Sequence, residues 1–114
     1  MSISHDDIGD NLRRIVITGR LDAPGTDSVA SMLEELVAAP RKGVVVDLSS
    51  IRFLASIGIR ALIVSAKVVE RRGGKMVLVV DDGSTVSQSL AATGVDQMVP
   101  VFSSTAEAEK AALL

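Results

Sequence analysis

The sequence contains no cysteine, tryptophan or tyrosine, and it has two phenylalanines and one histidine among 114 residues. Without cysteine the chain cannot form a disulfide framework, which fits a reducing compartment. With so few aromatic residues, the core must be built from aliphatic side chains. The hydrophobic content of 47% is sufficient for such a core. We therefore expect one domain over residues 1–114.

Excess charge and long apolar runs are also missing. A formal net charge of −2 gives no general electrostatic attraction to nucleic acid or to an anionic membrane. No apolar run approaches the roughly 18–20 residues of a membrane-spanning helix, and the N-terminus lacks the apolar segment of a signal peptide. These features predict a cytoplasmic protein with neither nucleic acid nor membrane as partner.

The inventory of catalytic motifs is equally thin. There is no Walker A sequence, no G-x-G-x-x-G and no G-x-S-x-G, and the single histidine lies in the polar N-terminal stretch. A carboxylate cluster of Asp22, Asp47, Asp81 and Asp82 would suit Mg²⁺. However, Asp47 falls within a predicted strand and Asp81-Asp82 within a turn, so we interpret these residues as solvated charges. We expect no enzyme activity, no cofactor and no metal.

Apolar runs and helical patterns alternate along the chain. Continuous or alternating apolar segments predict strands at residues 12–18, 44–48, 76–80 and 98–102, with a hairpin strand before the turn at 9–11. Helices are predicted from Thr26 or Asp27 to about Ala39 (ended by Pro40), over residues 57–72, from Thr85, and from Ser104. The fold class is therefore α/β: a single open, mainly parallel sheet with an N-terminal hairpin strand and about four helices. Its carboxyl-end loops are expected at residues 22–25, 49–56 and 81–85.

Ser56 lies where the strand at 44–48 gives way, through a short connection, to the helix at 57–72. One interpretation makes Ser56 the N-cap of that helix, its hydroxyl accepting from free backbone N–H groups. The other makes it a phosphate-bearing residue, because a helix N-terminus favours negative charge. Asp22 presents a similar choice between a loop hydrogen bond and part of a site at the sheet edge. The local sequence favours the cap for Ser56 and leaves the choice open for Asp22.

The helix over residues 57–72 has two apolar faces. Its core face contains Ile59, Leu62, Ile63, Ala66 and Val69. An outer stripe of Ile57, Ala61, Val64 and Val68 lies nearly opposite, flanked by Arg60, Lys67 and Arg71. The preceding helix differs, because it places Val29, Met32, Leu33, Leu36 and Val37 on one side and mainly polar residues on the other. The outer stripe is either scattered surface apolarity or a surface for a partner.

Five segments together resemble the STAS domain, and specifically the small bacterial anti-sigma factor antagonists, also called anti-anti-sigma factors. They occur in the order of that family and span nearly the whole chain. The segments are Ile17-Thr18-Gly19-Arg20-Leu21-Asp22, Val44-Val45-Val46-Asp47-Leu48-Ser49, Phe53-Leu54-Ala55-Ser56-Ile57-Gly58-Ile59, Arg72-Gly73-Gly74-Lys75-Met76-Val77-Leu78-Val79 and Thr93-Gly94-Val95-Asp96.

The resemblance implies a regulatory role for Ser56. In the family, the corner reads Asp-Ser-Ser-Gly or Asp-Ser/Thr-x-Gly, and an anti-sigma factor that is itself a serine kinase phosphorylates the first Ser or Thr. That position corresponds to Ser56, and Gly58 matches the glycine, whereas Ala55 replaces the aspartate. The implied partners are this kinase and a phosphatase acting on phosphorylated Ser56, with the protein a monomer or weak dimer. The implied partner surface comprises Asp22, Ala55, Ile57, Gly58, Arg60, Ala61, Val64 and Val68.

Two other functions remain open from the sequence. One is a constitutive STAS scaffold or adaptor subunit of a signalling or lipid-transport assembly, with Ser56 acting only as a cap. The other is a nucleotide-binding or nucleotide-hydrolysing protein that uses the N-terminus of the helix at 57–72. The main prediction is an anti-sigma factor antagonist whose binding is switched off by phosphorylation of Ser56.

Overall fold

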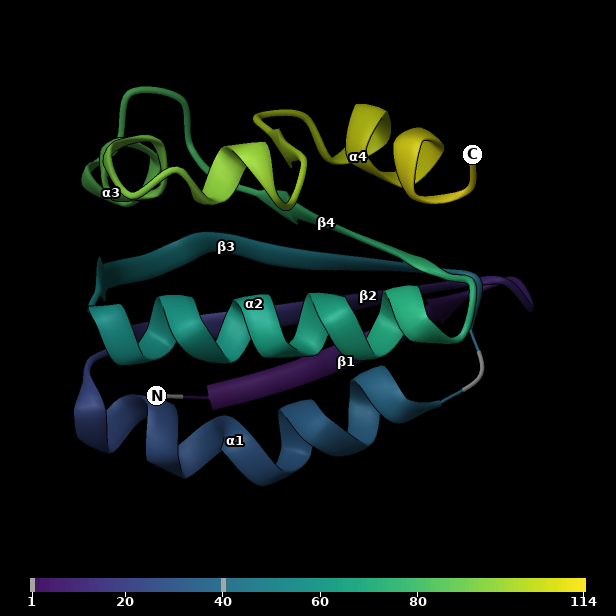
Figure 1. Ribbon diagram of the computed structural model, residues 1–114, viewed down its shortest axis with the longest axis horizontal. Coiled ribbons are helices and arrows are strands. Elements are labelled where there is room, and N and C mark those ends of the chain that lie inside the picture. The colour runs from purple at the N-terminus through teal and green to yellow at the C-terminus, as the bar shows by residue number, and fades with distance from the viewer. Residues whose placement is uncertain (1, 40) are drawn as a thin grey trace.

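The computed structural model describes residues 2–39 and 41–114, and its centre is one five-stranded sheet (Figure 1). The first two strands form an antiparallel hairpin, and the other pairings are parallel. The strands lie in chain order across the sheet: β1 (Ser2–Ile8), β2 (Leu12–Leu21), β3 (Gly43–Leu54), β4 (Lys75–Val79) and β5 (Val101–Phe102). This arrangement confirms the predicted α/β class with its N-terminal hairpin.

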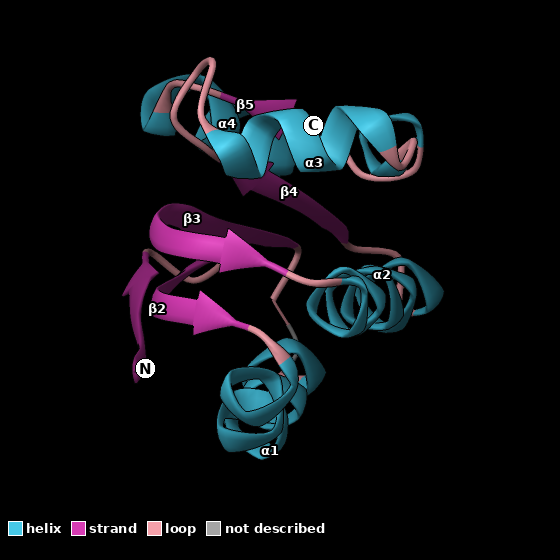
Figure 2. Cartoon of the chain, turned by 90° about the vertical axis from the view of Figure 1, so that its left-hand side faces the viewer, coloured by secondary structure: helices cyan, strands magenta, loops and turns pink. Residues whose placement is uncertain are grey.

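The helices cover the two faces of the sheet unequally. The helical segments are α1 (Ala23–Ala38), α2 (Ser56–Arg71), α3 (Thr85–Ala92), the short 3₁₀ helix η1 (Val95–Gln97) and α4 (Thr105–Ala112). Buried side chains of α1, α2, α3 and η1 share one core with the strands. On the other face, α4 packs its Ala108 and Ala112 against Val45, Val77 and Val79. Figure 2 shows α1 and α2 together on one side of the strands.

The apolar runs occupy the middle of the sheet, as predicted. Val44, Val45 and Val46 are completely buried because helices cover both faces at β3. Val77 and Leu78 of β4 are buried in the same way. Parallel strands need this two-sided cover, which explains why their sequences lack polar alternation.

β3 is longer than predicted and corrects the expected loop at residues 49–56. It continues to Leu54, which pairs with Leu21 of β2. The polar break is satisfied locally, because Asp47 Oδ1 accepts hydrogen bonds from the backbone N–H of Ser49 (2.9 Å) and from its hydroxyl (2.7 Å). The pairing of β2 with β3 shifts register between Val16 and Thr18 and between Gly19 and Arg20, and each shift accommodates one extra residue of β3. Pairing with β2 therefore keeps residues 49–54 in the strand, although the polar residues among them predicted a loop.

Several boundaries near helices also differ from the predictions. The first helix begins at Ala23, before Thr26, because Asp22 caps it and Pro24 suits its first turn. The expected loop at residues 22–25 is therefore mostly helix. Ser84 caps α3 in place of Thr85, whereas the predicted cap of α4 by Ser104 is confirmed. The predicted helix end at Pro40 lies outside the described residues.

Two further predictions about apolar residues are corrected. The last strand is only Val101–Phe102, because the N–H groups of Met98 and Val99 donate to the carbonyl of Val95 in the turn after η1, and Val99 packs into the core outside any strand. Met32 was placed on the core face of the first helix, but its side chain is exposed. The other four residues predicted for the core face of α1 are buried: Val29, Leu33, Leu36 and Val37.

An arginine network joins the hairpin to the C-terminal end of α1. The buried Arg13 donates to Asp7 (Nε–Oδ1, 2.7 Å) and to the carbonyl of Leu36 (3.0 Å). Arg41 donates to the other oxygen of Asp7 at 3.1 Å. Arg72 donates to the carbonyls of Val37 and Arg41, and its pKa is lowered by burial and by the charge of Arg13. Cations at the last turn of α1 complement the negative end of its dipole.

We predict that Asp7→Asn lowers the free energy of unfolding at neutral pH and makes it fall less steeply in acid. The hydrogen bond from Arg13 holds the pKa of Asp7 below its ordinary value. The contribution of the carboxylate is therefore full above the ordinary aspartate range and is lost as pH falls through and below that range. Urea unfolding from about pH 7 to about pH 3 measures the difference. Asp10→Asn is the control, because the exposed Asp10 carboxylate is in no ion pair of the network and its backbone carbonyl, which accepts from Arg41, is unchanged. Parallel pH profiles for wild type and Asp7→Asn would contradict the prediction.

Candidate functional site

At the corner between β3 and α2, the helix begins one residue earlier than predicted, so Ser56 is its first residue and not its N-cap. Ala55 is the N-cap, with φ −86° and ψ 166°, and no side chain caps the helix. The backbone N–H of Ala55 donates to the carbonyl of Leu21 (2.9 Å), which holds Ala55 in an extended conformation. Ile59 N–H then donates to the carbonyl of Ala55 (3.0 Å), so the helix starts there. The predicted N-cap role of Ser56 is wrong.

Ser56 is instead the first residue of α2, and its side chain is exposed. Within the part of the chain that the structure describes, its hydroxyl makes no hydrogen bond to another residue. The first turn of a helix has free N–H groups and the positive end of the dipole. The hydroxyl is therefore accessible in a setting that favours negative charge.

Asp22, at the end of β2, makes the loop hydrogen bond that the sequence offered as one of its two roles. Its Oδ1 accepts from the backbone N–H of Gly25 at 2.9 Å, which caps α1. Its Oδ2 lies 3.5 Å from Nε of Arg20. Asp22 is thus a helix-capping residue that is also part of a small surface ion pair.

Arg20 and Phe53 form a contact that sequence reasoning missed. The guanidinium of Arg20 lies 4.6 Å from the centre of the Phe53 ring, and Phe53 is 38% exposed. The two residues are paired across β2 and β3, so only the register brings them together. The signal in the sequence was weak: one of only two phenylalanines, three residues before Ser56. A cation over an exposed ring makes a semi-rigid apolar surface beside the corner.

The outer stripe of α2 is partly as predicted. Ile57 and Val64 are 48% and 53% exposed, whereas Ala61 and Val68 are half-buried and Val68 packs against the core. Arg60 is exposed beside them. On the inner face, Ile59, Leu62, Ala66 and Val69 are buried as predicted, and Ile63 is half-buried. The exposed stripe therefore narrows toward the end of the helix.

Gly58, which was predicted to contact the partner, faces inward in this structure. It is buried, and a Cβ atom on it would lie 2.9 Å from both Cβ and the carbonyl oxygen of Leu21. The first turn of α2 therefore approaches the end of β2 more closely than any larger residue allows. In this structure the glycine permits that close packing.

A shallow cavity of about 140 Å³ lies between α1 and α2. Ala61 and Val64 line it from α2, and Leu33 and Glu34 line it from α1. Two outer-stripe residues therefore border a small hollow rather than a flat surface. Such a hollow suits a single apolar side chain of a partner.

The structure does not assemble the carboxylates into a metal site. Among residues 2–39 and 41–114, no group of three or more His, Cys, Asp or Glu side chains could hold an ion. Asp22 caps α1 and Asp47 bonds to Ser49. In the same described ranges, no helix is long and apolar enough to cross a membrane.

The architecture, an open and mainly parallel sheet with an antiparallel hairpin at one edge and helices on both faces, is the fold of solved anti-sigma factor antagonists. An anti-sigma factor antagonist from Mycobacterium paratuberculosis superposes with a TM-score of 0.83 at 22% identity, covering 97% of this chain and 94% of that one. Phosphorylated SpoIIAA, a Bacillus cell fate determinant, gives 0.69 at 13% identity, with 96% and 98% covered. Unphosphorylated SpoIIAA gives 0.67 at 15% identity, with 93% and 92% covered.

The sequence itself matches the family model of the STAS domain over residues 6–108. The chain belongs to the STAS domain family, as its segments predicted. A comparison with curated proteins finds no match.

We predict that Gly58→Ala destabilises the protein by about 1–3 kcal/mol, because the new methyl group meets the backbone of Leu21. Helix propensity alone predicts the opposite sign, with alanine better than glycine by about 1 kcal/mol. Urea unfolding therefore separates the two effects. The control is Ser56→Ala, a change at an exposed residue two positions earlier in the same helical turn. A Gly58→Ala protein as stable as wild type would contradict the prediction, because it would show that the backbone of Leu21 moves to admit the methyl group at little cost.

Proposed function

We propose that this protein is an anti-sigma factor antagonist that binds a switch-type anti-sigma factor with serine kinase activity. Its STAS membership and its structural neighbours, whose names identify them as anti-sigma factor antagonists, support this function. The observation that carries it is Ser56: an exposed hydroxyl, unused as a cap, at the start of a helix with exposed apolar residues. We further propose that the protein itself catalyses no reaction and acts in the cytoplasm as a monomer or weak dimer.

The proposed binding surface runs from the ends of β2 and β3 along α2. Phe53, Ile57 and Val64 provide exposed apolar area, which is what a protein interface needs at its centre. Arg20 and Arg60 supply positive charge at its rim, which favours an acidic partner. The proposed surface also includes Asp22, which caps α1, and Ala55, which lies at the corner before α2. Ala61 and Val68 are half-buried and add a smaller apolar area.

Phosphorylation of Ser56 is the proposed off-switch. A phosphate would add about −1.5 to −2 charges at neutral pH, with its hydration shell beside Ile57. The N-terminus of α2 would stabilise the dianion, so the domain would stay folded while its surface changed. Like-charge repulsion from acidic partner groups would then separate the complex. A phosphatase acting on Ser56 would restore binding.

A second function is favoured by Ala55. In the family pattern an aspartate stands at this position, and Ala55 offers no carboxylate to a kinase. A constitutive scaffold or adaptor would use the same apolar surface without phosphorylation. The two functions differ in whether the charge on Ser56 controls binding, and the experiments below distinguish them.

The first prediction concerns the surface. Val64→Asp should leave the circular dichroism spectrum unchanged and abolish binding to the anti-sigma factor kinase of the same organism, because Val64 is exposed. Leu33→Asp should unfold the domain, since it buries a charge without a partner.

Ile8→Asp, an exposed apolar residue at the hairpin end, is the matched control and should bind normally. If Val64→Asp unfolds the protein as Leu33→Asp does, then Val64 belongs to the core and the proposed surface is wrong.

The second prediction concerns the switch. The kinase should incorporate phosphate at Ser56, as located by mass spectrometry. Ser56→Ala should remain bound and lose less than the roughly 1 kcal/mol of a missing N-cap, because Ala55 holds the cap position. Ser56→Asp should weaken binding by about tenfold or more, measured by titration calorimetry.

Thr105→Asp makes the same hydroxyl-to-carboxylate change at the first residue of α4, on the opposite face of the sheet. It should bind like wild type. Equal affinities for wild type, Ser56→Ala and Ser56→Asp, with no phosphate incorporated, would favour the constitutive scaffold.

A further inference from the structure

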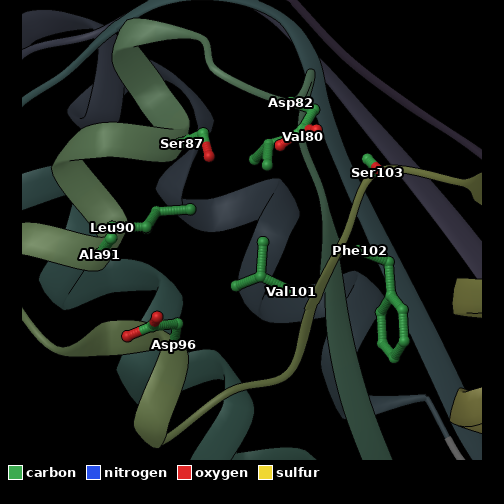
Figure 3. Close-up of a pocket in the computed structure, with 9 residues that line it drawn as sticks. All are labelled: Val80, Asp82, Ser87, Leu90, Ala91, Asp96, Val101, Phe102 and Ser103. Carbon is green, nitrogen blue, oxygen red and sulfur yellow. The ribbon is translucent and has the colours of Figure 1, made fainter.

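A cavity of about 390 Å³ lies beside α3 and the last two strands, and it shares no residue with the proposed partner surface (Figure 3). Val80 and Asp82 follow the end of β4, and Ser103 follows the end of β5. The cavity is thus at the carboxyl ends of two adjacent parallel strands. Open α/β folds bind their ligands at this edge of the sheet.

The cavity has an apolar floor and a polar rim. Val80 and Leu90 are buried and Val101 is half-buried, so three aliphatic side chains form the floor. In Figure 3, Leu90 of α3 points toward Val101, whereas the ring of Phe102 lies on the other side of the strand. The rim consists of Asp82, Ser87, Asp96 and Ser103.

Within residues 2–39 and 41–114, the rim side chains have no partners. Among the described residues, neither carboxylate is in an ion pair, and neither hydroxyl makes a hydrogen bond. No lysine, arginine or histidine lines the cavity. Unpartnered polar groups around an apolar floor are the general pattern of a small-molecule site.

The surrounding sequence has only one sign of charge. Residues 76–109 contain no lysine, arginine or histidine, although they carry five carboxylates, on Asp81, Asp82, Asp96, Glu107 and Glu109. A concave site within such a segment concentrates negative potential, because the apolar walls focus the field. The two charged side chains that line the cavity, Asp82 and Asp96, are both negative, which favours a cation over an anion.

We propose that this cavity binds an organic cation: a primary ammonium or guanidinium group on a short aliphatic chain. The chain would cover Val80, Leu90 and Val101, and the charged group would donate hydrogen bonds to Asp82 or Asp96. A neutral molecule of the same shape would leave the carboxylates unpartnered, and an anion would be repelled. The cation is either a lysine or arginine side chain of another polypeptide or a free small amine.

The test is titration of the isotope-labelled protein, followed by amide chemical shifts. The probes are 1,5-diaminopentane and N-acetyl-arginine methylamide, with 1-pentanol and pentanoate as neutral and anionic counterparts. We expect saturable shifts confined to the residues around the cavity for at least one cation, and none for the two counterparts. N-acetyl-lysine methylamide is added as a third cation. Binding of either amino-acid derivative identifies a polypeptide side chain as a source, and binding of the diamine without either derivative identifies a free amine.

The double variant Asp82→Asn/Asp96→Asn should lose affinity by about tenfold or more, because both charged acceptors are removed. Both residues are exposed, so the variant should keep the wild-type spectrum elsewhere. Asp81→Asn is the matched control, an exposed neighbour outside the cavity that should bind as wild type does. Shifts that do not saturate, that spread over all acidic surfaces, or that persist in the double variant would overturn the proposal.

Discussion

The pairing of β2 with β3 up to their carboxyl ends is the constraint on which the functional corner depends. Leu21 pairs with Leu54, and one residue further the N–H of Ala55 still donates to the carbonyl of Leu21. Both helices on this side begin directly after the pairing stops, α1 after Asp22 and α2 after Ala55. The two strand ends therefore fix the positions of both helix N-termini relative to each other.

This constraint also explains why the Ser56 hydroxyl is accessible. In a free corner, a serine before a helix would adopt the cap conformation and use its oxygen on the backbone. Here the sheet extends through Ala55, so the cap position falls on a residue without a polar side chain. The close packing of Gly58 on Leu21 then keeps the first turn in place. The sheet supplies the order that a side-chain cap would otherwise provide.

The sequence predicted the features that depend on local pattern. Apolar periodicity predicts the buried runs of β3 and β4, because the sheet is covered on both faces there. The spacing of apolar residues also predicts the inner face of α2, and the turn residues predict the hairpin. The extension of β3, the cap at Ala55 and the Arg20–Phe53 contact depend on inter-strand register, which spacing along one strand does not contain. Gly58 illustrates the same limit for the site. Its family position was recognised, but only the close approach to Leu21 reveals that it faces inward.

The two edges of the sheet limit what else it can join. β5 offers only two residues for pairing, and β1 presents exposed His5, Asp6 and Asp7 along the opposite edge. Short and charged edge strands discourage the addition of a strand from another molecule. A small domain with a mostly aliphatic sheet is thereby protected from edge-to-edge aggregation. Its apolar surface can then be concentrated on helices, where contacts are reversible and do not propagate from copy to copy.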